Sequence, residues 1–532
     1  MRKIVWLIIF VILSFESFAN NISISNVNIC NQDIVNHCTF IEFDISWENS
    51  WRVATGPSNW DASWVFIKYR LKNSTIWNHA SLNWVDGTGS GDGHTVPANA
   101  AISSSNDDGM GHSKGIFIYG NTEFPQGSVS YTGVKLRWNY GFDGVSDTDS
   151  IEYCVMAIEM VYVPQGSFYV GDGTSISIRG QFESGTSGAA LQITSEGALT
   201  LGGGGAGSLG NNNALGMAVG YKDDFNDVDS QTLPADFPKG YNAFYCMKYE
   251  ITQEQYVVFL NKLDRTQQNV RTNTNLSSGT TSVTNRYVMS NSATIISRNG
   301  VRCDASIHSS DPISFYCDYN GNDIANESDD GQNISCNWVN WADLAAYLDW
   351  AALRPMTELE YEKACRGTLS AVANEYAWGS SSIAKATGIS NSGANNETAS
   401  NVGANAASDN HASVQGPMRA GNFGQGVSTR VGVGATFYGI MEMSGNNWER
   451  AISVGNTKGR EFTGTHGNGE LNATGNADVS NWPGSDAIGA NSRGGYWRAP
   501  ASYLRVSDRY YGSFGLNIHH NSDGSRGVRI AP

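Results

Sequence analysis

The chain has 532 residues, several times the size of a usual single domain, so we expect more than one domain. Hydrophobic residues make up 40% and aromatic residues 11%, which excludes intrinsic disorder of the whole chain. The chain carries 34 basic and 50 acidic residues, a net charge of −16. An acidic chain without a basic stripe argues against nucleic acid as a partner.

The first 19 residues have the layout of a secretory signal peptide. Arg2 and Lys3 precede an apolar run over 4–13, and small residues end at Ala19. The run is too short to span a bilayer, and no later stretch is long and apolar enough. We therefore expect an exported protein (periplasmic, cell-surface or secreted) without a transmembrane segment.

The eight cysteines of an exported chain are candidates for disulfides. Cys30 and Cys38 are spaced to close a short loop. One further bridge is expected among Cys303, Cys317 and Cys336.

Residues 20–155 are predicted to form an all-β sandwich. The segments 40–47, 64–70 and 134–138 are rich in β-branched and aromatic residues, mostly alternate with polar ones, and are separated by turn residues. This spacing is typical of immunoglobulin-like or fibronectin-like sandwiches. The region has no catalytic cluster, so we expect a spacer or docking module.

The composition changes after residue 159. A Gly/Ser-rich segment over about 172–220 lacks the glycine spacing of phosphate-binding loops and is predicted to be a long loop or insertion. Thr252 with Gln255, and Thr357 with Glu360, form capping boxes that predict helix starts. A further helix is predicted from residue 341.

Ordered sequence blocks identify the C-terminal region. They are 160–171, 248–260, 340–350 with 353–362, 376–379, 439–449, 493–495 and 526–529. In this order they resemble the formylglycine-generating enzyme family, also called the sulfatase-modifying-factor domain, over residues 159–532. The resemblance implies an α+β domain with a C-type-lectin-like fold, here preceded by the β-sandwich.

The catalytic residues of that family do not carry over. The resemblance implies two copper-binding cysteines shortly after the Arg-Gly-Gly block, but Ala499 and Leu504 stand at the matching positions. Neither supplies the thiolate that acts as nucleophile and copper ligand. Of the nine histidines only His519 and His520 are adjacent, so no iron-binding cluster is indicated. We expect neither copper nor iron, and no catalysis.

Calcium is the cofactor that the resemblance implies. The first site would use the Glu442 and Glu449 carboxylates with the carbonyls of Gly445 and Asn447, which are oxygen ligands that suit a hard cation. A second would use Asn401 and Val402. The alternative is that Glu449 pairs with a nearby arginine.

The end of the chain has an unusual composition. Residues 499–532 contain no Lys, Glu, Gln, Met or Trp, and all residue types in 510–523 are reachable from AAC or AAT codons by changing adenines alone. In position and composition the segment resembles the mutagenised segment of diversity-generating-retroelement variable proteins. The alternative is that its apolar residues are ordinary core.

The leading hypothesis is an exported, non-catalytic ligand-binding protein. Its C-terminal segment, about 496–525, would form a diversified surface for an unknown protein or cell-surface ligand. The expected contacts are Trp497, Arg498, Tyr503, Asp508, Tyr510, Tyr511, Phe514, Asn517, His519 and His520. The alternatives are a metal-dependent oxidoreductase of the same family and a structural envelope component.

Overall fold

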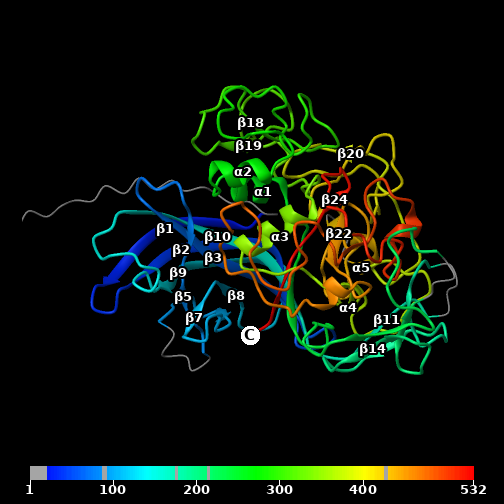
Figure 1. The fold of residues 1–532 in the computed structure, drawn as a ribbon. Coiled ribbons are helices and arrows are strands. Elements are labelled where there is room, and N and C mark those ends of the chain that lie inside the picture. The colour runs from blue at the N-terminus through cyan, green and yellow to red at the C-terminus, as the bar shows by residue number, and fades with distance from the viewer. Residues whose placement is uncertain (1–20, 87–92, 174–177, 212–215, 425–428) are drawn as a thin grey trace, which may run out of the picture.

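The computed structural model describes residues 21–86, 93–173, 178–211, 216–424 and 429–532 (Figure 1). The predicted signal peptide, residues 1–19, lies outside these ranges. Across the described residues, none of the helices has the length and apolar character needed to cross a membrane.

The first sheet has five antiparallel strands, in the order β1-β2-β9-β5-β7. In β2 nearly every second side chain is buried from Thr39 to Trp47, as the alternating sequence predicts. The strand bounds are Ser23–Asp33 (β1), Cys38–Arg52 (β2), Leu82–Asn83 (β5), His112–Ser113 (β7) and Phe124–Trp138 (β9).

The second sheet combines strands of the N-terminal region with β17 and β25 of the C-terminal region. Its order is β25-β17-β10-β3-β8-β6, with β4 paired to β3. Strand β10 pairs with β3 from Ile151 to Val161 and with β17 from Met160 to Val163. The strand bounds are Asp61–Leu71 (β3), Asn78–His79 (β4), Ala100–Ser103 (β6), Ile116–Gly120 (β8), Ile151–Val163 (β10), Phe244–Met247 (β17) and Val528–Ile530 (β25).

The two sheets share one apolar core, to which Trp47, Ile67, Ile118 and Leu136 contribute. The other face of β3 is buried too, because it packs on the C-terminal region. There the Trp64 indole donates to the Ala351 carbonyl at 2.9 Å. Strand β3 is therefore buried along almost its whole length.

The glycine-rich segment is not the long loop that its composition predicts. It forms a β11–β13 pair and a four-stranded sheet in the order β12-β15-β14-β16. Buried side chains, among them Leu191, Leu201 and Leu209, give these short strands an apolar face. Their bounds are Phe168–Val170 (β11), Phe182–Ser184 (β12), Leu191–Ile193 (β13), Leu199–Gly202 (β14), Leu209–Asn211 (β15) and Ser230–Leu233 (β16).

Few helices accompany the sheets, so the protein is mixed α/β and mostly sheet. Both predicted capping boxes are confirmed, at Thr252 and at Thr357. The helices are Gln253–Leu260 (α1), Arg265–Val270 (α2), Trp341–Trp350 (α3), Glu358–Arg366 (α4), Arg430–Val433 (α5) and Thr457–Arg460 (α6). Two 3₁₀ turns, Asn422–Gly424 and Ala501–Leu504, and two short hairpins, Val301–Cys303 (β18) with Phe315–Cys317 (β19) and Ile389–Ser390 (β20) with Thr398–Ala399 (β21), lie between them.

The predicted disulfides are wrong in this structure, where all eight cysteines are free thiols. Cys30 lies opposite Phe40, while Cys38 lies opposite Asp33. In the β18–β19 hairpin Cys303 likewise lies opposite Phe315. The expected partners are thus offset along their strands, and a disulfide needs a close approach of the two Cβ atoms.

Candidate functional site

The C-terminal segment closes over a small sheet and leaves a cavity. The sheet contains Ala490–Arg493 (β23), Trp448–Ile452 (β22) and Asp523–Gly524 (β24). Between β23 and β24 the chain runs through the 3₁₀ turn 501–504 and an irregular stretch to residue 522. The cavity, about 370 Å³, is lined by Trp448, Ser492, Tyr496, Ala499, Pro500, Tyr503, Tyr511, Phe514, Leu516, Ile518, His520, Ser522 and Asp523.

Aromatic rings dominate the cavity wall. The Trp448 ring centroid lies 5.8 Å from that of Tyr496, 6.0 Å from Tyr503 and 5.6 Å from Tyr511. Phe514 lies 4.9 Å from Tyr511. We call these five residues the aromatic cage. Such rings offer large contact area at low entropic cost, together with tyrosine hydroxyls for hydrogen bonds.

The floor of the cavity is polar. The buried Asp523 accepts from the Ser522 hydroxyl at 2.9 Å and lies 3.7 Å from the Arg450 guanidinium. Burial raises the pKa of the Asp523 carboxyl, and Arg450 opposes that shift. Arg450 also donates to the carbonyls of Phe514 and Leu516, at 3.1 and 3.2 Å, so it holds the cage segment in place.

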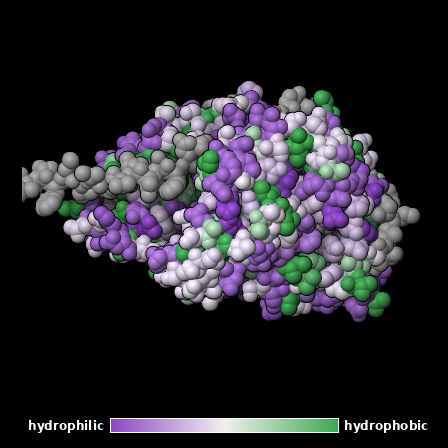
Figure 2. Space-filling view, turned by 90° about the horizontal axis from the view of Figure 1, so that it is seen from above, coloured by the Kyte–Doolittle hydropathy of each residue, from purple (hydrophilic) through white to green (hydrophobic). Residues whose placement is uncertain are grey.

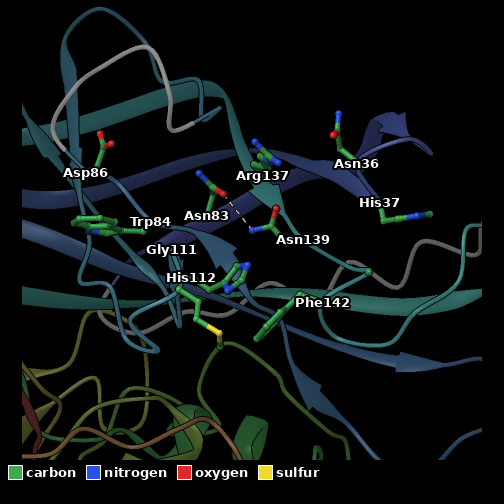
Figure 3. Close-up of a pocket in the computed structure, with 12 residues that line it drawn as sticks. Asn36, His37, Asn83, Trp84, Asp86, Gly111, His112, Arg137, Asn139 and Phe142 are labelled. Atoms are coloured by element: carbon green, nitrogen blue, oxygen red, sulfur yellow. Dashed lines mark hydrogen bonds between the residues drawn. The ribbon is translucent and has the colours of Figure 1, made fainter.

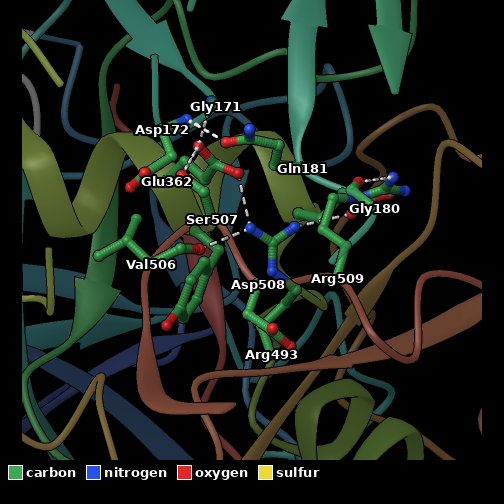
Figure 4. Close-up of polar contacts among 12 residues, drawn as sticks. Gly171, Asp172, Gly180, Gln181, Glu362, Arg493, Val506, Ser507, Asp508 and Arg509 are labelled. Carbon is green, nitrogen blue, oxygen red and sulfur yellow. Dashed lines mark hydrogen bonds and ion pairs between the residues drawn. The ribbon is translucent and has the colours of Figure 1, made fainter. Parts of the chain in front are cut away.

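Buried ion pairs fix the chain that carries the cage, and Figure 4 shows that of Arg493 with Glu362. Arg493 pairs with Glu358 at 2.8 Å and with Glu362 at 2.6 Å. Arg509 pairs with Glu358 and Asp223, both at 2.7 Å. All of these side chains are fully excluded from solvent, so α4 anchors the chain just before Tyr496 and again between Tyr503 and Tyr511.

The structure brings four of the predicted contact residues to the cavity lining: Tyr503, Tyr511, Phe514 and His520. Tyr510 is not part of the lining but packs against two of these residues, with its ring 5.2 Å from that of Tyr503 and 4.8 Å from that of Tyr511.

The other predicted contacts lie outside the lining. Trp497 is buried and donates to the Asn521 carbonyl, and Arg498 is exposed. Asp508 is buried against Arg179 at 2.8 Å. Asn517 accepts from the backbone N–H of Ala342, and His519 lies 2.8 Å from Asp343, so both attach the segment to the start of α3.

Sequence reasoning missed Trp448, Tyr496 and Asp523. Trp448 lies in the block 439–449, from which the sequence predicted only calcium ligands. Tyr496 directly precedes a predicted contact, and its aromatic character was the available signal. The pairing of β24 with β22, which places Asp523 opposite Trp448, is visible only in the structure.

Of the two positions aligned with the family cysteines, Ala499 lines the cavity. Leu504 is fully buried in the apolar cluster that also contains Ala499. No cysteine occurs among the described lining residues, and Cys365, the last cysteine of the chain, packs in a different cluster. The cavity therefore holds no thiolate for copper-dependent cysteine oxidation.

The predicted calcium ligands lie in a buried acidic cluster. Glu442 accepts from the Gly421 N–H at 2.9 Å through one carboxylate oxygen, while the other is buried without a partner. Asn447 also has a buried side-chain oxygen without a partner. Burial raises the pKa of Glu442 to about 7, and the charge of Arg526 opposes that shift. Unsatisfied oxygens among surplus carboxylates suit a hard cation.

Glu449 forms the arginine pair that was the alternative at this site, with Arg526 at 2.6 Å. Glu250, a third buried carboxylate that sequence reasoning missed, accepts from Asn446 at 2.6 Å and from the Asn447 N–H at 2.9 Å. The charges of Arg526 and Arg419 both act on Glu442, and the three buried carboxylates still outnumber these two arginines, so a cation is compatible with the cluster.

The second predicted calcium site has fewer free oxygen ligands. The Asn401 side-chain oxygen already accepts from the Thr387 N–H at 2.8 Å, and its amide donates to the Lys385 carbonyl. The side chain of Val402 is fully exposed.

A larger cavity, about 500 Å³, lies at the first sheet (Figure 3). Asn83 and Asn139 are joined by a hydrogen bond of 3.3 Å in it, and Phe142 stacks on His112 at 4.0 Å. It contains none of the predicted site residues.

Comparison with known families decides the identity of the region that carries the cage. A family model described as a Sulfatase-modifying factor enzyme 1-like domain matches residues 204–529. The chain belongs to this family. A search among curated proteins found no match. The match to the sulfatase-modifying-factor family begins after β14 and ends in β25, so it includes the cage and the acidic cluster but not the first sheet.

Proposed function

We propose that this protein is an exported, non-catalytic ligand-binding protein. Its sulfatase-modifying-factor domain would serve as a C-type-lectin-like scaffold, and the β-sandwich in front of it as a spacer or docking module. The observation that carries the proposal is the aromatic cage, because most of it is built by the segment whose composition first indicated a binding surface.

A protein or cell-surface ligand suits the cavity best. A volume of about 370 Å³ lies within the range of binding pockets and accommodates one side chain or one sugar rather than an extended substrate. Leu516 and Ile518 add exposed apolar surface at the lining. Aromatic anchors surrounded by apolar and polar rim residues are typical of protein-binding hot spots.

The test is a binding selection followed by paired variants. The purified full chain is screened against a phage-displayed peptide library and a glycan array, and the affinity for the best peptide or glycan is measured. Tyr511→Ala should weaken that affinity at least tenfold, because it removes a ring from the middle of the cage.

Phe142→Ala provides the matched control, since this exposed aromatic residue lines the other cavity. It should leave the affinity within twofold. A ligand lost through Phe142→Ala and retained by Tyr511→Ala would contradict the proposal and move binding to the first sheet. Oxidation of a cysteine peptide by the copper-treated protein would favour the oxidoreductase alternative.

Diversification of the segment is a separate part of the proposal. Apart from Asp523, which pairs with Arg450, the residues of 510–523 that line the cavity form no ion pair in the described structure, so their replacement would alter the wall without breaking the buried ion pairs around it. The gene tests this. Codons at 510–523 should end predominantly in C or T, with a near-copy of the segment and a reverse transcriptase gene nearby. Absence of both features would refute it.

Calcium is proposed at the acidic cluster, held by the Glu442 and Glu449 carboxylates with the carbonyls of Gly445 and Asn447. There it would offset the surplus negative charge and tie together the loops beneath the cage. We do not extend the proposal to Asn401 and Val402, because the Asn401 oxygen is already engaged.

A further inference from the structure

A second acidic cluster lies far from the cage, in the loop that follows β19. This loop is at the top of the view in Figure 1, and Figure 2 shows the upper face of the molecule as mostly hydrophilic. One carboxylate oxygen each of Glu327, Asp329 and Asp330 lies within 4.8 Å of the other two.

The charges of this cluster are not compensated by basic groups. Two other acids of the loop do have basic partners. Asp318 pairs with Arg302, and Asp323 pairs with both Arg302 and Arg286. Among the residues that the structure describes, Glu327, Asp329 and Asp330 form no ion pair. Within the described residues, three carboxylates are therefore gathered without an ion pair to a basic side chain.

Asp330 is the observation that points to a ligand. Its side chain is fully buried, and its Oδ1 atom has no hydrogen-bond partner. The pKa of this carboxyl is raised to about 6, chiefly by burial and also by the charges of Asp318, Asp329 and Glu327, against the hydrogen bond from the Glu327 N–H. A buried oxygen without a donor is costly unless another group satisfies it.

The loop has part of the spacing of a calcium loop, and of the matching positions only Asp329 belongs to the acidic cluster. Asp318, Asn320, Asn322 and Asp329 stand at positions 1, 3, 5 and 12 of a twelve-residue segment. Position 6, usually glycine, is Asp323 with a φ of +69°, so the same left-handed turn is made. No helix flanks this loop, which follows strand β19.

Side-chain amides complete the ring of polar groups. Asn320 donates to Asp329 at 3.1 Å and to Glu327 at 3.4 Å, and Asn322 also donates to Glu327. Asp318 has a different role, because its carboxylate accepts hydrogen bonds from the N–H groups of Gly321 and Asn322 at 2.9 and 3.1 Å. It thereby shapes the loop around the three acids.

We propose that Glu327, Asp329 and Asp330 bind a calcium ion, with the loop 318–330 folded around it. Carboxylate oxygens are the ligands that calcium prefers, and the partly exposed Glu327 and exposed Asp329 leave room for water to complete six to eight ligands. This site is separate from the acidic cluster at Glu442, which lies in the matched family blocks.

The test titrates the full chain, stripped with a chelator, with calcium chloride in a calorimeter. The variant Glu327→Gln with Asp329→Asn should lose one binding site or bind there at least tenfold more weakly. Both side chains lie at the surface side of the cluster, so the variant should remain folded. Asp311→Asn is the matched control, because it removes an exposed acid of the same region outside the cluster, and it should bind as the parent does.

A second readout separates this site from that at Glu442. Terbium, which replaces calcium, should give luminescence excited through Tyr319, the neighbour of Asn320 in the chain. The part of the signal that is lost in the Glu327→Gln, Asp329→Asn variant should be retained in Glu442→Gln. Calcium binding with unchanged number and affinity in the double variant would overturn the proposal.

Discussion

The two parts of the molecule hold their chains in place by different means. Residues 21–163 form long antiparallel ladders around an apolar core, and their ion pairs, such as Arg70 with Glu152, are partly exposed. The remainder has short strands and long loops with fully buried arginines, namely Arg302, Arg354, Arg366, Arg450, Arg493, Arg509 and Arg526.

The difference follows from where backbone groups find partners. In a ladder the neighbouring strand satisfies them, so the side chains can be apolar. In loops the carbonyls need other donors, and the guanidinium groups supply these. Arg265 alone donates to the carbonyls of Leu276, Ser277, Thr280, His308 and Asp311. Buried arginines thus replace strand pairing in the C-terminal part.

The largest expected effect tests this replacement. Arg493→Met should lower the free energy of unfolding by about 3–5 kcal/mol, because it removes the shared guanidinium partner of the two buried carboxylates Glu358 and Glu362. Urea unfolding measures the loss. Arg70→Met, at a partly exposed pair, should cost about 0–1 kcal/mol. Equal losses would remove the distinction between the two parts.

A cavity in the apolar core tests the other part. Leu136→Ala should cost about 2–5 kcal/mol, since the fully buried side chain packs between the two sheets. Thermal unfolding is the measurement. Val35→Ala, at an exposed hydrophobic residue of the same part, should stay within about 0.5 kcal/mol. A loss of that small size at Leu136 would contradict the shared core.

A pH dependence should arise where α3 meets the loop over residues 467–478. Burial raises the pKa of Asp349 from 3.8 to about 7, although the N–H groups of Asn468 and Asp478 donate to it. The folded state binds this proton more tightly than the unfolded state. The free energy of unfolding should therefore fall as pH rises from about 4 to about 7.

Asp349→Asn should remove that contribution, which amounts to at most about 1.4 kcal/mol per pH unit. Unfolding at pH 5, 6 and 7 gives the slope. Asp236→Asn, at an exposed acid, should keep the parental slope. If the slope of Asp349→Asn matches that of the parent, Asp349 is not the group that titrates.

The smallest effects are expected at the surface of the C-terminal segment. Arg498→Ala and Ile518→Ser should each change the free energy of unfolding by less than about 0.5 kcal/mol, since both side chains are exposed. Urea unfolding again measures this. A loss above 2 kcal/mol would support the alternative interpretation, in which the apolar residues of this segment are ordinary core residues.

Local patterns in the sequence predicted local structure well. The capping boxes at Thr252 and Thr357 each need only residues three apart, and the alternation of β2 needs only one strand. The family blocks located the cage segment because they fix its flanks. The spacing of Asp318, Asn320 and Asn322 is likewise a local pattern that the sequence alone contains.

Contacts between distant residues could not be predicted in the same way. Arg493 and Glu358 are 135 residues apart, and no periodicity links them. The cage needs Trp448 from one strand and Tyr511 from a loop that returns beside it. Glycine content predicted a loop over 172–220. The leucines between the glycines are buried, and this burial favours short strands over an open loop.

The continuity of strand β10 has a practical consequence for fragments of this protein. A fragment cut at the family match, residues 204–529, would lose β10, which pairs with β17. The backbone of β17 would then present unpaired N–H and carbonyl groups along a newly exposed edge, and such edges recruit other chains. We expect that fragment to aggregate, whereas a fragment that begins before Asp61 would keep β3 and β10 together.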